Sequence, residues 1–159
     1  MAGAIIDAEA ASAFEELFTS GRITGLTAPE DRIGGYAGQV MLAKDYLRVL
    51  RLRGPAAAAL DATLAGYDAI VGPTLPTVAW PIDTPFDKVY PDFPGGAAID
   101  GAANLCGVPG LFVVNGLGEG GLPTSLQFTG RAGAEAMLLE VGRQYQARTT
   151  HHQLRPTGF

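Results

Sequence analysis

The chain has 159 residues, of which 47% are hydrophobic and 17% charged, and its formal net charge is −5. This negative balance argues against a nucleic-acid partner, because no basic surface is available to neutralise phosphates. The single cysteine, Cys106, excludes an internal disulfide and favours a reducing, cytoplasmic compartment. The amino-terminal stretch lacks the basic region of a signal peptide, and no apolar run reaches the length of a membrane span.

The first third of the chain predicts helices. Apolar residues recur at helical spacing over residues 4–18 and again over 36–53. Gly54-Pro55 is expected to interrupt the second helix, because proline lacks a backbone donor and crowds the preceding turn. An alanine-rich helix is then expected to resume and to end at Gly66.

The remainder predicts strands alternating with helices. Short apolar or alternating runs at 67–73, 111–114 and 125–129 are typical of strands, and residues 97–105 and 133–148 have helical patterns. The proline-rich segment 73–98 is expected to be a long loop of functional importance. Together these elements indicate an α/β fold, a partial mixed β-sheet covered by helices, within a single incomplete domain over residues 1–159.

The segment 116–121 matches the G-x-G-x-x-G pattern of dinucleotide-binding loops. That pattern works only where the glycines open a helix whose amino terminus holds the pyrophosphate. Here Leu122-Pro123 and an alternating strand follow instead. We therefore interpret the segment as a glycine-rich turn between two strands, and we expect no nucleotide or other cofactor.

Cysteine and histidine residues suggest a catalytic pair or a metal site. Cys106 with His151 or His152 has the composition of a thiol hydrolase, but Cys106 is expected at a helix end and the histidines lie in a polar tail. Adjacent histidines diverge on regular structure, and no third ligand lies at a useful spacing. A cysteine hydrolase therefore remains a remote alternative, and no metal site is expected.

Serine-based catalysis also lacks a complete set of residues. A serine hydrolase needs a nucleophile, a base and an oxyanion hole. None of the three serines lies in a nucleophile elbow or a glycine-serine-rich loop, and neither lysine lies in an apolar setting that would lower its pKa. The residues concerned are Ser12, Ser20, Ser125, Lys44 and Lys88. We therefore assign no catalytic residue to this chain.

Several motifs, taken in order, resemble the carboxy-terminal portion of the amidase signature family. They comprise a glutamate-alanine helix, a second long helix, a tyrosine-aspartate strand leading into a proline-threonine-proline loop, an asparagine-glycine-proline element and a glycine-leucine-proline turn before a glutamine strand. They stand at Ile5–Ala11, Asp45–Arg53, Tyr67–Pro76, Asn104–Pro109 and Gly120–Gln127, and His151-His152 with Arg155-Pro156 resembles the family's terminal tail.

The resemblance implies the C-terminal part of an amidase-signature fold and hydrolysis of a carbon–nitrogen amide bond. Members of the family use a serine nucleophile, a second serine in a cis peptide linkage and a lysine. All three precede the region matched here, so no position of this chain inherits them. The resemblance thus implies an amidase fragment that is inactive alone and contributes the fold and the walls of a substrate cleft.

Five residues are candidates for the walls of that cleft: Pro73, Thr74, Pro76, Trp80 and Asn104. Proline-bounded loops suit such a wall because their φ angles are fixed in advance. For Asn104 a structural role, as a helix cap or a support of loop backbone groups, is favoured over substrate contact. A non-catalytic binding or interaction module derived from an amidase is the second hypothesis for the chain. The expected partners are an N-terminal amidase half or a second copy, with a small amide bound only by the completed site.

Overall fold

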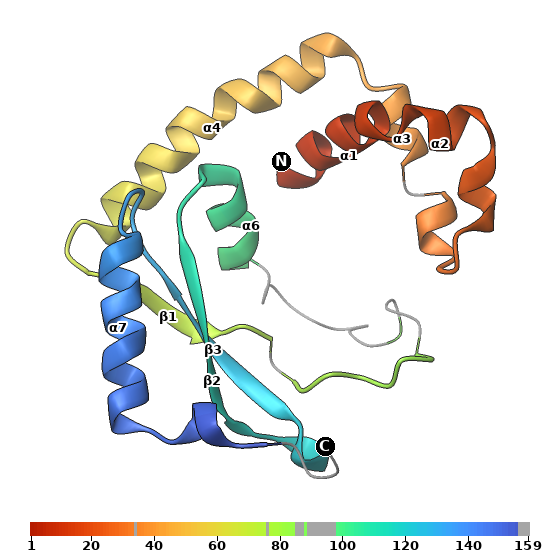
Figure 1. Cartoon of the computed structure of the whole chain (residues 1–159). Helices are drawn as coiled ribbons and strands as arrows, with labels where there is room; N and C mark the ends of the chain where they lie inside the picture. Colours follow the sequence, from red (N-terminus) through yellow and green to blue (C-terminus); the bar gives the residue numbers. More distant parts are fainter. Residues whose placement is uncertain (34, 76, 85–87, 89–97, 156–159) are drawn as a thin grey trace. The chain divides into compact units, whose positions relative to one another are not determined.

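The computed structural model of the chain describes residues 1–33, 35–75, 77–84, 88 and 98–155 (Figure 1). Its contacts divide the chain into two compact units, Met1–Ala57 and Ala58–Phe159. The first unit is helical and the second contains the sheet. The expectation that residues 1–159 form one incomplete domain stays a prediction.

The helical unit begins with two helices rather than the single helix expected over 4–18. α1 ends at Ala13, and Phe14, with φ −111° and ψ 25°, separates it from α2. No proline or glycine stands at this break, so the helical spacing of apolar residues predicts one continuous helix. The elements of the unit are α1 (Ala2–Ala13), α2 (Glu15–Thr19), η1 (Arg22–Gly25), η2 (Glu30–Arg32), α3 (Tyr36–Gln39) and the first part of α4 (Ala43–Leu64).

Glycines bring the helices of this unit into close contact. A Cβ atom at Gly38 in α3 would lie 2.0 Å from the carbonyl oxygen of Asp7 in α1. A Cβ atom at Gly35 would lie equally close, 2.0 Å, to the ring of Phe18, which also meets Tyr36 edge to face at 5.5 Å. Backbone and ring therefore occupy the space that larger side chains would need.

The expected interruption of a helix at Gly54-Pro55 is wrong. α4 runs unbroken from Ala43 to Leu64 with Pro55 inside it. Proline removes one helical hydrogen bond and crowds the preceding turn, but Ala56 to Ala59 follow immediately, and alanine has the highest helix propensity. The helix also begins at Ala43, since Tyr36 belongs to the separate short helix α3.

The second unit contains a three-stranded sheet in the order β1-β3-β2. Both described pairings are antiparallel, with Gly72 opposite Gln127 and Phe112 opposite Gln127 on the other side. The unit comprises β1 (Ile70–Pro73), α6 (Ala98–Cys106), β2 (Gly110–Leu117), η3 (Glu119–Gly121), β3 (Pro123–Thr129), α7 (Glu135–Arg148) and η4 (His151–Gln153). The strands and helices expected from the sequence are thus confirmed within one or a few residues.

Helix α7 covers one face of the sheet. A Cβ atom at Gly142 would lie 2.6 Å from the side chain of Leu111, so helix and strand approach closely there. The ring of Tyr145 meets Phe128 edge to face at 6.2 Å. Figure 1 shows α7 beside the strands, with α6 on a different side of them. The α/β fold class is confirmed.

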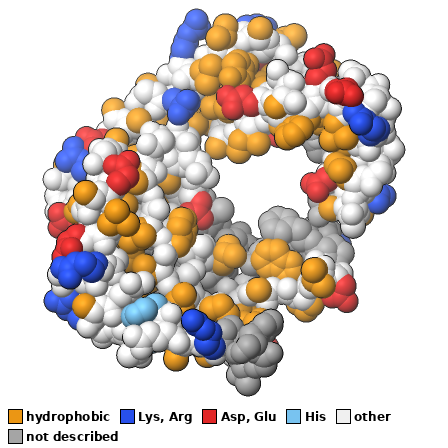
Figure 2. Space-filling model, in the orientation of Figure 1, with side chains coloured by type: hydrophobic (Ala, Val, Ile, Leu, Met, Phe, Trp, Pro, Cys, Tyr) orange, Lys and Arg blue, Asp and Glu red, His pale blue; other side chains and the backbone are white. Residues whose placement is uncertain are grey.

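Large hydrophobic side chains are exposed in both units. Ile82 is fully exposed and Val40 is 79% exposed. Figure 2 shows hydrophobic side chains gathered at several places on the visible surface. Patches of this kind commonly mark surfaces that another molecule covers.

Candidate substrate-cleft residues

The end of β1 holds the first two candidates. Pro73 is the last residue of the strand and is exposed, and the next residue, Thr74, is half-buried. The backbone N–H of Thr74 donates to the carbonyl oxygen of Ser125 at 3.1 Å, which continues the β1–β3 ladder by one residue. The Thr74 hydroxyl oxygen is buried and has no hydrogen-bond partner within the described residues. A buried hydroxyl without a partner loses stabilisation, so this group is available for a further bond.

The other three candidates occupy different places. Trp80 lies in the described segment 77–84 and is half-buried, whereas Asn104 is exposed on α6. Pro76 lies outside the described residues. Among the candidates that the structure describes, Pro73 and Thr74 are neighbours at the end of one strand.

A polar row on β3 is a feature that the sequence pattern did not identify as a site. Gln127 is 3% exposed and Thr129 is 1% exposed. The Nε2 atom of Gln127 donates to Oγ1 of Thr129 at 3.0 Å, while its Oε1 atom is buried without a partner in the described part of the chain. Alternation on a strand usually places polar residues outward. On β3, Gln127 and Thr129 are nevertheless buried.

The strand register places Thr74 beside this row. Gly72 lies opposite Gln127, and Thr74 bonds to Ser125, so their side chains point to the same face of the sheet. A Cβ atom at Gly72 would meet no atom of the described residues within 4 Å. Open space at Gly72 therefore lies between two residues, Thr74 and Gln127, that each have a buried oxygen without a partner among the described residues. This arrangement is suited to hydrogen-bonding a small polar group.

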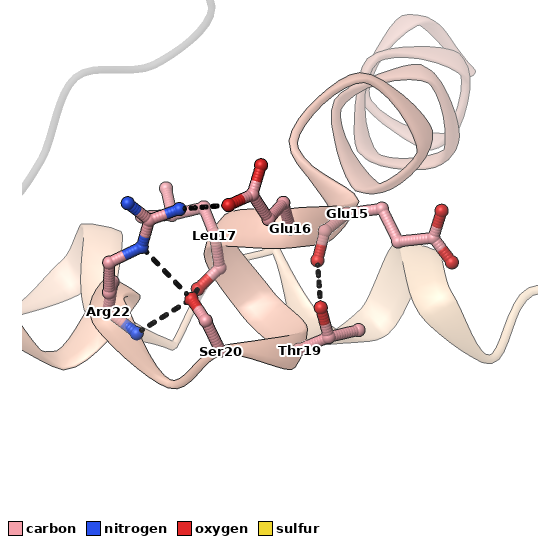
Figure 3. A network of polar contacts seen from close by, with 6 residues as sticks. All are labelled: Glu15, Glu16, Leu17, Thr19, Ser20 and Arg22. Carbon is pink, nitrogen blue, oxygen red and sulfur yellow. Dashed lines mark hydrogen bonds and ion pairs between the residues drawn. The ribbon is translucent and has the colours of Figure 1, made fainter.

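The serines hold different positions, and Ser20 takes part in a local network. Its Oγ atom accepts from the Nε atom of Arg22 at 3.1 Å, and Arg22 donates to Glu16 at 2.6 Å (Figure 3). This network closes the turn after α2 and lies on the surface. Ser125 is half-buried on β3. Lys44 is exposed in the first turn of α4.

Ser12 lies beside a cavity of about 490 Å³ in the helical unit, which Glu9 and Tyr46 also line. The Tyr46 hydroxyl donates to Glu9 at 3.2 Å. Partial desolvation, followed by this hydrogen bond, raises the pKa of Tyr46. A phenol with a raised pKa keeps its proton at neutral pH and is a poor base for Ser12.

Cys106 and the two histidines stand on separate elements, α6 and η4. Cys106 ends α6, where Gly107 takes φ 69° and donates its N–H to Ala103 at 2.8 Å. The ring of His151 lies tilted beside that of Tyr145, with 6.3 Å between their centroids, and the Nδ1 atom of His152 is buried without a partner among the described residues. The part of the chain that the structure describes also contains no group of three or more metal-ligating side chains.

The glycine-rich segment is a turn, as its sequence indicates. η3 (Glu119–Gly121) joins β2 to β3, and Gly120 and Gly121 have φ values of 64° and 72°. The N–H of Gly118 donates to the carbonyl oxygen of Leu122 at 2.7 Å. A strand follows instead of a helix, so the segment lacks the helix amino terminus that holds a pyrophosphate.

An ion pair joins the end of α4 to the segment after β3. Arg131 donates through Nε and Nη2 to the two carboxylate oxygens of Asp61, at 2.6 and 2.8 Å. The hydrogen bond from Arg131 lowers the pKa of Asp61. Arg131 also lines a cavity of about 460 Å³ with Tyr67 and Asp68. Two parallel hydrogen bonds fix the orientation of the guanidinium group.

Curated relatives align with most of this chain but with a small part of their own length. A glutamyl-tRNA(Gln) amidotransferase subunit of Aromatoleum aromaticum is 39% identical over 115 residues, which are 70% of this chain and 22% of the relative. The corresponding subunit of Nitrosomonas europaea is 31% identical over 153 residues, 91% of this chain and 30% of the relative. The chain thus spans less than a third of the length of these relatives. No family model matches it.

Solved amidase structures show the same fold over a similar range. The crystal structure of an amidase superposes with a TM-score of 0.74 at 26% identity, covering 89% of this chain and 33% of that one. A peptide amidase in complex with the competitive inhibitor chymostatin superposes with a TM-score of 0.59 at 35% identity, covering 82% and 26%. None of the helices among the described residues is long and apolar enough to cross a membrane.

Proposed function

Because the chain belongs to the amidase signature family and corresponds to its carboxy-terminal portion, we propose that it forms cleft walls of an amide-hydrolysing enzyme whose catalytic residues lie elsewhere. The observation that carries this proposal is the superposition on an amidase at a TM-score of 0.74, over 89% of this chain but 33% of that structure. The fold of this portion is therefore present. The proposed chemistry is hydrolysis of a carbon–nitrogen amide bond after another segment completes the site.

The proposed contribution of this chain centres on the sheet face around Gly72. The buried oxygens of Thr74 and Gln127, which have no partners among the described residues, lie on this face. A carboxamide has both a donor and an acceptor, so it complements a hydroxyl and an amide oxygen. Pro73 supports the proposal because proline fixes the backbone before Thr74. Pro76, Trp80 and Asn104 stay proposed cleft residues.

The proposed division of labour also rests on the places of the serines and Lys44. Ser20 is held by Arg22 on the surface, and Lys44 is exposed. A base in this chemistry needs a lowered pKa, which burial in an apolar setting supplies. We therefore propose that the nucleophile and the base come from an N-terminal amidase segment, in a reducing cytoplasmic compartment that suits the single cysteine.

Ammonia release from primary carboxamides tests this proposal. The purified chain is expected to give none, and activity is expected when it is co-expressed with the amino-terminal segment of an amidase. Turnover by the chain alone, lost on replacing Ser12, Ser20 or Ser125 with alanine, would overturn it. Turnover lost with Cys106→Ala would instead favour the cysteine hydrolase.

The role of Thr74 is tested in the same complemented enzyme. Thr74→Val is expected to raise KM about tenfold, because one hydrogen bond to the amide is lost, while Thr74→Ser retains the hydroxyl and most of the activity. Thr63→Val is the matched control, since its hydroxyl bonds to Ala59 within α4. Equal effects of Thr74→Val and Thr63→Val on KM would show that Thr74 does not contact the substrate.

A further inference from the structure

The helical unit contains an open groove with a packed apolar floor. The groove has a volume of about 390 Å³ and is lined by residues of α1, α2 and η1. Its floor includes Phe18, which is 8% exposed, and Ile23, which is 2% exposed. The backbone of Gly35 and the ring of Tyr36 both lie against the Phe18 ring. A floor that is already packed has little conformational freedom to lose when another molecule covers it.

One wall of the groove is apolar and open to solvent. Phe14 is 59% exposed, and Leu17 and Leu26, which also line the groove, are half-buried. Arg32 donates from Nε to the carbonyl oxygen of Leu26 at 2.6 Å and from Nη2 to that of Thr27 at 3.2 Å, which holds this wall in place. An exposed apolar wall above a buried floor is typical of a surface that another molecule covers.

Two carboxylates line the same groove. Asp7 on α1 is half-buried, and Asp31 in η2 is exposed. Neither forms an ion pair within the described residues, where Arg22 pairs with Glu16 and Arg32 donates to carbonyl oxygens. A molecule that covers the groove removes water from Asp7, which costs free energy unless that molecule supplies a cation or a hydrogen-bond donor. The occupant is therefore expected to combine apolar groups with a positive charge.

The structural comparison indicates which molecule is available to cover the groove. The amidase superposition covers 89% of this chain, and Met1–Ala57 is more than a third of the chain, so the superposition extends into the helical unit. It covers only 33% of the amidase, so most of that protein has no counterpart in this chain. The helical unit is thus part of a larger fold whose remaining segments have to pack against the portion that is present.

The helical unit also limits the secondary structure of the occupant. The described residues of Met1–Ala57 form helices and helical turns but no strand, so the groove offers no ladder of backbone groups. A segment that lies in the groove must satisfy its own N–H and carbonyl groups, as a helix does. Apolar residues spaced three or four apart on such a helix reach the groove from one face.

We propose that this groove binds a helix of the amino-terminal amidase segment, with apolar side chains against Phe14 and Phe18 and a lysine or arginine beside Asp7. The inference rests on the proposed function, because it names a surface through which that missing segment attaches. Charge complementarity favours a basic helix over an acidic one. A second copy of this chain fits the two carboxylates less well, since its formal net charge is −5.

Co-purification with the amino-terminal segment of an amidase, expressed together with this chain, tests the proposal. Phe14→Lys places a charge on the groove wall and is expected to raise the dissociation constant of the complex at least about tenfold. Ile6→Lys is the matched control, since Ile6 lies on α1, is also 59% exposed and is not among the described residues that line the groove. It is expected to change the dissociation constant by less than about threefold.

Asp7→Asn tests the charge with little change in side-chain shape. It is expected to raise the dissociation constant about tenfold at low salt and by less at high salt. Asp45→Asn, at an exposed position on α4 outside the groove lining, is its control. Thermal unfolding of each variant alone checks its fold. If Phe14→Lys destabilises the chain, Asp7→Asn decides instead.

A photo-reactive benzoylphenylalanine in place of Phe14 identifies the occupant, and it is expected to cross-link to a helix of the amidase segment. A complex that tolerates Phe14→Lys as well as Ile6→Lys would show that the segment binds elsewhere, and the proposed function would stand. Cross-linking to a second copy of this chain would likewise overturn the proposal. Failure of the unaltered chain to form a complex would contradict both the proposal and the proposed function.

Discussion

The two units are held together in different ways. In Met1–Ala57 the helices meet where glycines allow backbone contact, as at Gly38 against Asp7. In Ala58–Phe159 the sheet and α7 meet through side chains, as where Leu111 approaches Gly142 and where Phe128 meets Tyr145. Close backbone contact has little room to adjust, whereas side chains can repack around a change. Substitutions should therefore have unlike effects in the two units.

The largest effect is expected from Gly38→Val. Its Cβ atom would lie 2.0 Å from the carbonyl oxygen of Asp7, so α1 and α3 must separate. We expect the free energy of unfolding of this unit to fall by about 4 kcal/mol or more, the range of severe steric changes. Chemical denaturation with amide exchange in residues 1–57 measures it. Gly25→Val is the control, since its Cβ atom would meet nothing within 4 Å in the described part of the chain. An equal loss of unfolding free energy in the two variants would show that the close contact between α1 and α3 does not stabilise this unit.

Gln127→Glu should have the next largest effect, in the sheet unit. It places a carboxylate at a position that is 3% exposed, beside Thr129. Burying an unpaired charge is expected to cost about 3–4 kcal/mol at neutral pH, whereas Gln127→Met should cost about 1 kcal/mol.

The pH dependence of Gln127→Glu provides its control. Burial raises the folded-state pKa of the new carboxyl above its unfolded value of about 4.3. Stability is then fully present below the unfolded pKa and is lost as the pH rises through the folded pKa. Denaturation at pH 4 and pH 7.5 should show the deficit only at the higher pH. A deficit that does not change with pH would mean that shape, rather than charge, is responsible.

Leu138→Ala tests side-chain packing between α7 and the sheet. Leu138 is 2% exposed and its side chain lies 3.2 Å from the position of a Cβ atom at Gly130. Removing it should lower the free energy of unfolding by about 3 kcal/mol. Leu139→Ala, at a position 65% exposed on the same helix, should change it by less than about 0.5 kcal/mol. Thermal unfolding of both variants gives the comparison, and similar changes in the two would contradict it.

The same contrast explains which elements could be predicted from the sequence. The three strands, α6 and α7 follow from apolar patterns because side chains determine their packing. The break at Phe14 and the separate helix α3 do not follow from such patterns. A contact such as that of Gly38 with Asp7 depends on which backbone segment lies nearby in the folded chain, and the local sequence does not specify this. The prediction of a helix break at Pro55 is wrong because the high helix propensity of the alanines that follow outweighs the destabilising effect of proline on the helix.

The candidate site was predicted less completely than the fold. Pro73 and Thr74 stand at the end of β1, and their role as cleft walls stays a prediction. The buried role of Gln127 could not be predicted, because alternation on β3 suggested that its polar residues face solvent. Whether the polar side chains of a strand are buried depends on what packs over that face of the sheet, and the strand's own sequence does not contain this information.

The smallest effect is expected from Asp61→Asn, because the pair with Arg131 lies at the surface and such pairs contribute little. The hydrogen bond from Arg131 lowers the folded-state pKa of Asp61. The contribution of Asp61 to the free energy of unfolding is therefore present above the unfolded pKa of about 3.9 and is lost as the pH falls through the folded pKa.

The wild type should therefore lose its small stability advantage over Asp61→Asn below about pH 4, and high salt should reduce that stability advantage at neutral pH. Thermal unfolding at pH 3 and pH 7 measures both changes, with Asp45→Asn as the control because Asp45 is an exposed aspartate in α4. A large loss at neutral pH would mean that this one ion pair holds α4 against the segment after β3, and that the sheet unit depends on polar contacts as much as on packing.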